Sequence, residues 1–126
     1  MRISIITLFP DLMSTALSHS ILGRAQKKGS VEFNIVDLRQ FGIGTHKTVD
    51  DKPYGGGKGM VLKVDVLDRA IQNTKLNIKG EKTVLLCPQG EVYSQEMAEN
   101  LSKLSHIILV CGHYEGFDER VRSIVD

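Results

Sequence analysis

Four short segments of the chain are rich in apolar and β-branched residues and are bounded by turn-forming residues, a pattern that predicts β-strands. They are Ile3 to Phe9, Val31 to Leu38, Thr83 to Cys87 and His106 to Cys111. The last two are almost continuously apolar rather than alternating, which is typical of parallel strands covered on both faces. The pattern therefore predicts an α/β fold with a mostly parallel sheet and flanking helices.

Apolar residues at helical spacing lie between the predicted strands. Polar residues that are suited to helix N-caps precede or open these segments, and glycine at position 29 closes the second one. The predicted caps are Asp11, Ser20, Asp65 and Ser94. The last of them places a helix inside the stretch from Val84 to Val110, which predicts a strand, helix, strand crossover.

The end of the chain carries a further helical pattern, with apolar residues on one face at Phe117, Val121, Ile124 and Val125. This predicted helix reaches Asp126 without a glycine cap or a following turn. We therefore expect the chain to be a fragment of a longer protein. A natural C-terminal helix that frays is the alternative.

Composition narrows the function classes only modestly. A length of 126 residues with 41% hydrophobic residues suits one domain with a real core, and a net charge of +1 argues neither for nor against nucleic acid. The two cysteines, Cys87 and Cys111, lack zinc-site spacing and predict reduced thiols. No apolar run resembles a signal peptide or a membrane span, so we expect a cytoplasmic protein.

The segment 48–60, TVDDKPYGGGKGM, places four glycines in five residues around Lys58. Glycines let a ligand approach the main chain closely, so the segment favours a binding loop, with a flexible loop as the alternative. It is no P-loop, because Lys58 is followed by glycine and no strand directly precedes the segment. Asp50 and Asp51 are candidates for a base, although neighbouring loop acids more often form Asx turns or stay solvated.

Two of the buried strands end in glycine turns, at 87–90 and 111–116. Ligands of open parallel sheets bind outside the carboxyl ends of the strands, so these turns are predicted to share a pocket. The candidate contacts are Pro88, Gly90, Gly112, Tyr114 and Glu115. Ordinary strand-end turns are the alternative. No histidine pair has metal-ligand spacing and no serine lies in G-x-S-x-G, so neither a metal site nor acyl transfer is predicted.

Taken together, the segment 48–60, the run Pro88 to Gly90 and the run CGHYEGFDERV at 111–121 resemble bacterial tRNA (guanine-N1)-methyltransferases. The likeness begins at Ile3 and extends along the whole chain. The resemblance implies a knotted, SPOUT-type α/β fold and a homodimer. It also implies that S-adenosylmethionine donates a methyl group to N1 of the guanine 3′-adjacent to the anticodon in tRNA.

The resemblance also implies roles for particular residues. It assigns Pro88 and Gly90 to a first donor-binding loop, and it assigns Gly112, Tyr114 and Glu115 to a second. The tRNA side of the site would be formed by Asp50, Gly55, Gly56, Gly57, Lys58 and Gly59. Backbone amides and nearby lysines there would contact phosphates. No metal ion is expected, and Asp50 is a possible contributor to catalysis.

The sequence departs from the family in ways that limit the expected activity. Family members continue past Asp126 with a segment that completes the knot and the donor pocket, supplies the aspartate base and leads to a tRNA-binding helical domain. The resemblance therefore implies that residues 1–126 form an incomplete N-terminal donor-binding domain that is inactive alone. In addition, His113 replaces a common arginine, and Glu91 replaces a usual basic residue.

Two other functions stay open at this point. One is a related SPOUT enzyme that methylates a ribose 2′-hydroxyl. The other is a non-catalytic nucleotide- or RNA-binding module, whose binding would weaken steeply with salt and ignore S-adenosylmethionine.

Overall fold

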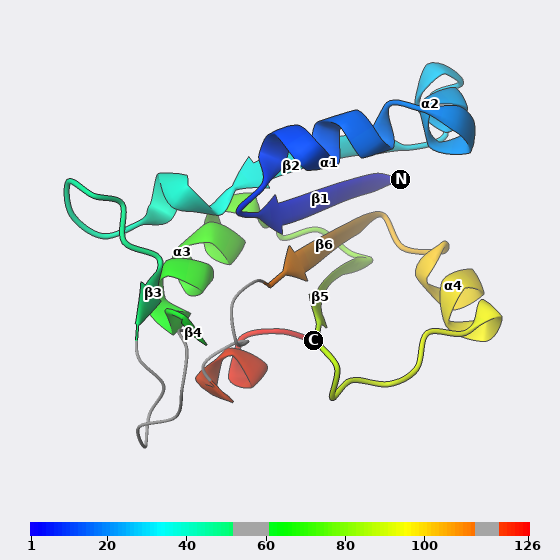
Figure 1. Cartoon of the computed structure of the whole chain (residues 1–126). Coiled ribbons are helices and arrows are strands. Elements are labelled where there is room, and N and C mark those ends of the chain that lie inside the picture. The colour runs from blue at the N-terminus through cyan, green and yellow to red at the C-terminus, as the bar shows by residue number, and fades with distance from the viewer. Residues whose placement is uncertain (52–60, 113–118) are drawn as a thin grey trace.

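The structure, a computed structural model, describes residues 1–51, 61–112 and 119–126 (Figure 1). Its centre is a four-stranded sheet in the order β2-β1-β6-β5, in which every neighbouring pair is parallel. The strands are β1 (Arg2–Thr7), β2 (Glu32–Asp37), β5 (Glu81–Leu86) and β6 (His106–Cys111). The predicted parallel α/β architecture is confirmed, and the predicted strands differ from the observed ones only at their ends.

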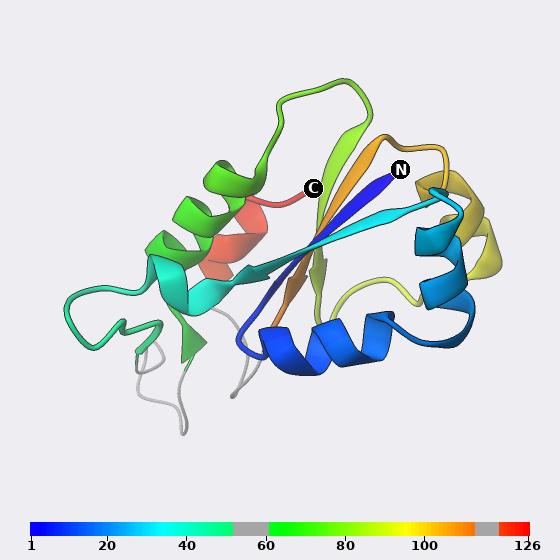
Figure 2. The ribbon, with the colours of Figure 1, turned by 90° about the horizontal axis from the view of Figure 1, so that it is seen from above.

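Helices connect the strands on both sides of the sheet. They are α1 (Pro10–Leu17), α2 (Ser20–Lys27), α3 (Val64–Thr74) and α4 (Gln95–Leu101). Figure 2 shows α3 on one side of the sheet and α1 with α2 on the other. Among the described helices, none combines the length and the apolar character needed to cross a membrane.

The predicted helix caps are confirmed at one position and wrong at three. The Ser94 hydroxyl accepts a hydrogen bond from the Met97 amide at 3.2 Å, as an N-cap should. Asp11, Ser20 and Asp65 instead lie inside the first turns of helices that begin earlier than expected. The first of these helices can begin at proline, whose fixed φ suits a first turn and whose missing N–H needs no cap.

The last predicted helix is also corrected. Phe117 lies outside the described residues, but from Glu119 on a short 3-10 helix, η2 (Glu119–Ser123), replaces the predicted helix, and the chain then runs along the outer edge of β5. The Asp126 amide donates to the Thr83 carbonyl at 2.9 Å, and the Thr83 amide donates to the Asp126 carboxylate at 2.8 Å. Continuing as an α-helix would forfeit these hydrogen bonds to an open strand edge.

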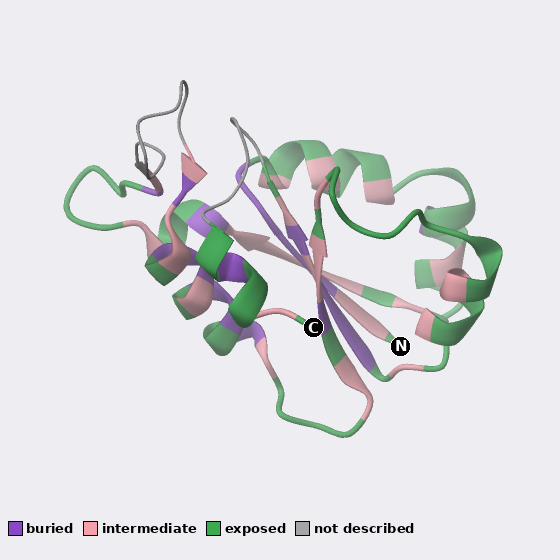
Figure 3. Ribbon diagram, turned by 90° about the horizontal axis from the view of Figure 1, so that it is seen from below, coloured by how far each residue is buried: buried purple, intermediate pink, exposed green. Residues whose placement is uncertain are grey.

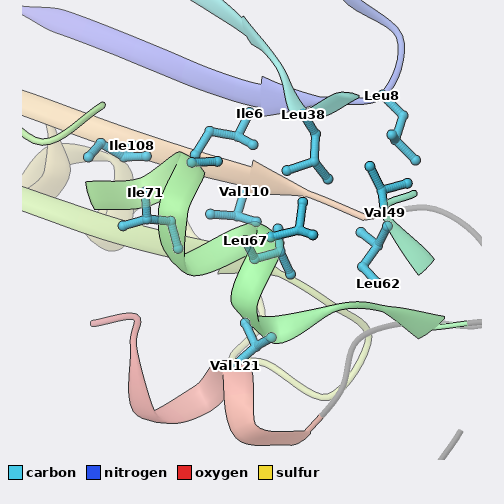
Figure 4. Packing of buried hydrophobic residues seen from close by; sticks show 12 residues of the cluster. Ile6, Leu8, Leu38, Val49, Leu62, Leu67, Ile71, Ile108, Val110 and Val121 are labelled. Carbon is cyan, nitrogen blue, oxygen red and sulfur yellow. The ribbon is translucent and has the colours of Figure 1, made fainter. Parts of the chain in front are cut away.

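The main core lies between α3 and one face of the sheet (Figure 4). Ile6, Ile108 and Val110 from the central strands pack against Leu67 and Ile71 of α3. Each of these side chains is fully buried, which contributes about 1.5–3 kcal/mol apiece before entropy is counted. Residues outside these four strands and α3 join the same cluster, and these are Leu8, Leu38, Val49, Leu62 and Val121.

The opposite face of the sheet is covered less completely. No residue of α1 or α4 is buried, and Figure 3 shows both helices as mainly exposed or intermediate. The prediction that the last two strands are covered on both faces therefore holds better for β6 than for β5. At the end of β5, Leu86 is 48% exposed, because β5 is an edge strand and α4 lies off to its side (Figure 1).

A line of polar side chains crosses the core face near the start of the strands. The ring of His106 is fully buried, with Nε2 2.8 Å from the Ser4 hydroxyl and Nδ1 2.7 Å from a carboxylate oxygen of Glu81. The side-chain amide of Asn34 donates to the same Ser4 hydroxyl at 3.2 Å. Each of the four strands thus contributes one residue to a continuous hydrogen-bonded network.

Candidate functional site

The candidate site lies where β5 and β6 end. Leu86 and Cys111 are paired as the last residues of these parallel strands, so the loops that begin at Cys87 and Gly112 leave from adjacent positions on one edge of the sheet. Pro88, Gly90 and Gly112 are all exposed there. This is the edge at which open parallel sheets bind ligands. The two glycine turns that the sequence singled out therefore start side by side.

The first turn is tight, yet its glycine is not required by the turn itself. The Gly90 amide donates to the Cys87 carbonyl at 3.3 Å. A Cβ added to Gly90 would lie 3.5 Å from that carbonyl oxygen and 3.8 Å from the Cys87 sulfur, which are ordinary contacts. The backbone is also not in the left-handed region at this residue. The missing side chain leaves open space beside the strand end, as a closely approaching ligand needs.

The described residues on either side of the segment 52–60 form a small hairpin that the sequence did not predict. Strand β3 (Asp50–Asp51) pairs antiparallel with β4 (Val61–Leu62), and Asp50 lies opposite Leu62. Val49 and Leu62 are buried beside Leu8, the residue just beyond the carboxyl end of β1 (Figure 4). Since β1 and β6 are parallel, the hairpin base lies toward the same edge of the sheet as the two strand-end turns.

Some predicted contacts lie outside the described residues. These are Gly55, Gly56, Gly57, Lys58, Gly59, Tyr114 and Glu115. The described ones are Asp50, Pro88, Gly90 and Gly112, and no bound ligand tests any of their roles, which stay predictions.

A hydrogen bond joins η2, near the end of the chain, to the loop that begins at Cys87. Arg122 in η2 donates from Nη2 to the side-chain oxygen of Gln89 at 2.6 Å. Its Nε donates to Glu119 at 2.8 Å. Neither Arg122 nor Glu119 was among the predicted site residues, because 33 positions separate Arg122 from its partner and no local motif signals such a contact.

The titratable groups at this edge do not form a reactive cluster among the described residues. Burial raises the pKa of the Cys111 thiol, so it stays protonated near neutral pH and is a poor nucleophile. No group of three His, Cys, Asp or Glu side chains in the described ranges is placed to hold a metal ion. The geometry offers exposed backbone, a proline and polar side chains, which suit binding and orienting a ligand.

The sequence model for tRNA (guanine-1)-methyltransferase TrmD matches residues 1–126, the whole chain. The chain belongs to the tRNA (guanine-1)-methyltransferase family. Curated relatives agree: a tRNA (guanine-N(1)-)-methyltransferase of Geobacillus kaustophilus is 53% identical over 122 residues, and one of Staphylococcus epidermidis is 46% identical. Each alignment covers 97% of this chain.

A solved structure supports the same family assignment. The crystal structure of tRNA (m1G37) methyltransferase from Aquifex aeolicus matches with a TM-score of 0.89 and 40% identity, covering all of this chain and 57% of that one. The α/β fold expected for a SPOUT-type methyltransferase domain is thereby confirmed. The chain spans about half the length of the curated relatives it matches.

Proposed function

We propose that this chain is the donor-binding part of a tRNA (guanine-N1)-methyltransferase that uses S-adenosylmethionine. The target would be N1 of the guanine 3′-adjacent to the anticodon. Membership of the family carries this proposal, together with the side-by-side start of the loops at Cys87 and Gly112. We further propose that residues 1–126 form an incomplete SPOUT domain, and that tRNA is bound by a C-terminal domain outside these residues.

The described residues at the strand ends suit a ligand such as adenosine, which can bind through hydrogen bonds to exposed main chain. Exposed main chain at Pro88, Gly90 and Gly112 offers hydrogen-bonding groups to a base and a ribose, and the space at Gly90 admits close approach. We assign these three residues, with Tyr114 and Glu115, to the donor site. Bound there, the sulfonium supplies an electrophilic methyl carbon.

The reaction needs a proton acceptor as well as a donor. The N1 lone pair forms the new bond to carbon, the sulfur leaves as a neutral thioether, and the N1 proton must pass to a base. Asp50, held at the base of the hairpin, is our candidate for orienting the guanine rather than for accepting its proton. The segment Gly55 to Gly59, with Lys58, would contact the tRNA.

We also propose that the protein is a cytoplasmic homodimer. Large apolar side chains stay exposed on α1 and α2, including Leu12 at 65% and Ile21 at 72%. The family resemblance carries this proposal, and these exposed apolar side chains are available to a partner surface. Sedimentation of the chain should reveal a concentration-dependent dimer, which substituting Leu12 and Ile21 with serine should weaken.

Calorimetric titration with S-adenosylmethionine tests the donor site directly. We expect saturable binding that Gly90→Ala weakens, and no binding of comparable strength for ATP. The alternative is that the chain binds a tRNA transcript with an affinity that falls steeply with salt and that S-adenosylmethionine does not change. That result would identify a non-catalytic RNA-binding module.

Methyl transfer is tested by incubating tRNA with labelled donor and analysing the nucleosides by mass spectrometry. The isolated chain should form no 1-methylguanosine, because we place the base outside it. In a full-length relative, replacing the target guanine with adenine should abolish transfer. If the tRNA with adenine at this position is still methylated, on a ribose 2′-hydroxyl, the enzyme is a ribose methyltransferase.

A further inference from the structure

One side-chain contact joins the end of the chain to the loop that follows β5. The Nη2 group of Arg122 lies 2.6 Å from the side-chain oxygen of Gln89, and Glu119 binds the Nε of the same guanidinium at 2.8 Å. A guanidinium that is fixed by a carboxylate on one side presents its remaining N–H groups in a defined direction. Gln89 lies between Pro88 and Gly90, the two predicted donor contacts of this loop.

The helix that carries Arg122 is firmly anchored. Its neighbour Val121 is fully buried in the main core, and η2 lies beside α3 in Figure 2. The chain that follows is held by two hydrogen bonds between Asp126 and Thr83 at the outer edge of β5. Arg122 therefore extends from a rigid base on the core side of the sheet.

The loop 87–90, at the other end of the contact, is restrained by few interactions. Pro88, Gln89 and Gly90 are all exposed, and among the described residues the loop's own main-chain contact is the 3.3 Å hydrogen bond from Gly90 to Cys87. Without the Arg122 contact, the loop would gain conformational freedom at little energetic cost. Its geometry beside the strand end thus depends on a residue 33 positions further along the chain.

We propose that Arg122 is a positioning residue that holds the loop 87–90 in its binding conformation, with Glu119 orienting the guanidinium. The importance of this contact for a methyl donor rests on the function proposed above. Arg122 itself touches no donor in this scheme. It acts through Gln89, by reducing the conformational freedom that the loop would otherwise lose on binding.

The half-buried thiol of Cys87 provides a readout that needs no ligand. A Cβ at Gly90 would lie 3.8 Å from the Cys87 sulfur, so the turn partly covers this thiol and its opening should expose it. Alkylation by iodoacetamide, followed at the peptide level by mass spectrometry, reports Cys87 and Cys111 separately in the same sample. The variants are Arg122→Gln, the conservative Arg122→Lys, and Arg24→Gln as a charge-matched control on the exposed surface of α2.

Arg122→Gln should raise the Cys87 alkylation rate about threefold to tenfold, the range expected for losing one partly exposed hydrogen bond to a charged group. Arg122→Lys should recover part of the protection, and Arg24→Gln should leave the rate unchanged. The S-adenosylmethionine dissociation constant should rise over the same range in Arg122→Gln. Equal Cys87 rates in Arg122→Gln and Arg24→Gln would overturn the proposal.

The two measurements separate this proposal from the proposed function. A faster Cys87 reaction with unchanged donor affinity would refute the positioning role, even though the contact holds the loop. If the unsubstituted chain binds no S-adenosylmethionine, the proposed donor site in this chain fails. The alkylation comparison would still decide whether Arg122 restrains the loop.

Discussion

Substituting Glu81 with glutamine should destabilise the fold considerably, although the two side chains have nearly the same shape. One carboxylate oxygen of Glu81 accepts from the Leu76 amide at 2.7 Å and lies 2.7 Å from Nδ1 of His106. The other oxygen accepts from the Asn77 amide at 3.2 Å. A glutamine keeps one acceptor oxygen, so its NH₂ group must face at least one of these three N–H donors.

The expected loss is about 2–3 kcal/mol in the free energy of unfolding. Hydrogen bonds to a charged acceptor each contribute roughly 1.5–3 kcal/mol, and a mismatched donor adds a desolvation cost. The glutamine oxygen still accepts some of these hydrogen bonds, which reduces the total loss of stability. The Glu81 side chain is only 9% exposed, so water replaces little of what is lost. For a domain of this size, the loss corresponds to a fall in Tm of roughly 10 °C.

The pH dependence of this effect has a definite sign. Burial would raise the pKa of Glu81, but hydrogen bonds from the Leu76 amide, the His106 ring and the Asn77 amide outweigh it, so the pKa lies below its ordinary value of 4.5. A carboxyl with a lowered folded-state pKa stabilises the fold above its unfolded pKa and loses that contribution as pH falls through the folded one. The gap between wild type and Glu81→Gln should therefore stay constant from pH 8 to 5 and close at lower pH.

Far-ultraviolet circular dichroism in urea is the suitable assay, because the chain contains no tryptophan. Glu32→Gln is the matched control, since Glu32 is 69% exposed and pairs only with Arg2 among the described residues, at 2.8 Å. That substitution should change stability by at most about 0.5–1 kcal/mol. A Glu81→Gln loss no larger than the control's would show that the network contributes nothing net, and a gap that widens below pH 4 would refute the lowered pKa.

Three further outcomes are expected. Gly90→Ala should change the free energy of unfolding by less than about 1 kcal/mol, because a Cβ there makes only ordinary contacts. Gly42→Ala should cost about 1–3 kcal/mol, because a Cβ at Gly42 would lie 2.3 Å from the Lys47 carbonyl carbon. Equal urea midpoints for the two variants would contradict this. The alkylation rate of Cys111 should keep rising with pH beyond 9, its ordinary pKa, and a plateau below pH 9 would show that burial does not raise it. Val121→Ala should lower stability by about 1–3 kcal/mol in urea unfolding and speed Cys87 alkylation, and an unchanged midpoint would show that η2 is not anchored through the core.

Much of the architecture could be predicted from local patterns. The apolar runs at 83–87 and 106–111 indicated parallel strands, and the carboxyl-end rule placed the two glycine turns together. Where prediction failed, distant contacts decided the structure. The extended end of the chain after η2 pairs with Thr83, which no window of sequence around position 121 contains.

The hairpin at the base of the glycine loop illustrates the same limit. Asp50 and Asp51 have poor strand propensity, yet they pair with Val61 and Leu62. Their neighbour Val49 explains why: it is 2% exposed in the core, and the Lys63 amide donates to its carbonyl at 2.8 Å. Core burial of Val49, just before β3, and of Leu62 in β4 brings the polar pair into the hairpin, so burial determines the hairpin and propensity does not.

Polar groups are arranged differently at the two ends of the sheet, because one end stabilises the strands and the other is the candidate binding edge. Near the amino ends, Ser4, His106 and Glu81 form hydrogen bonds with one another, and this network ties β1, β5 and β6 into one register. At the carboxyl ends, Pro88, Gly90 and Gly112 leave main chain exposed. A ligand site needs the second arrangement, and that exposed edge keeps its shape only if the rest of the sheet is fixed. Loosening the network through Glu81→Gln should therefore weaken calorimetrically measured binding at the proposed donor site, although Glu81 makes no contact there.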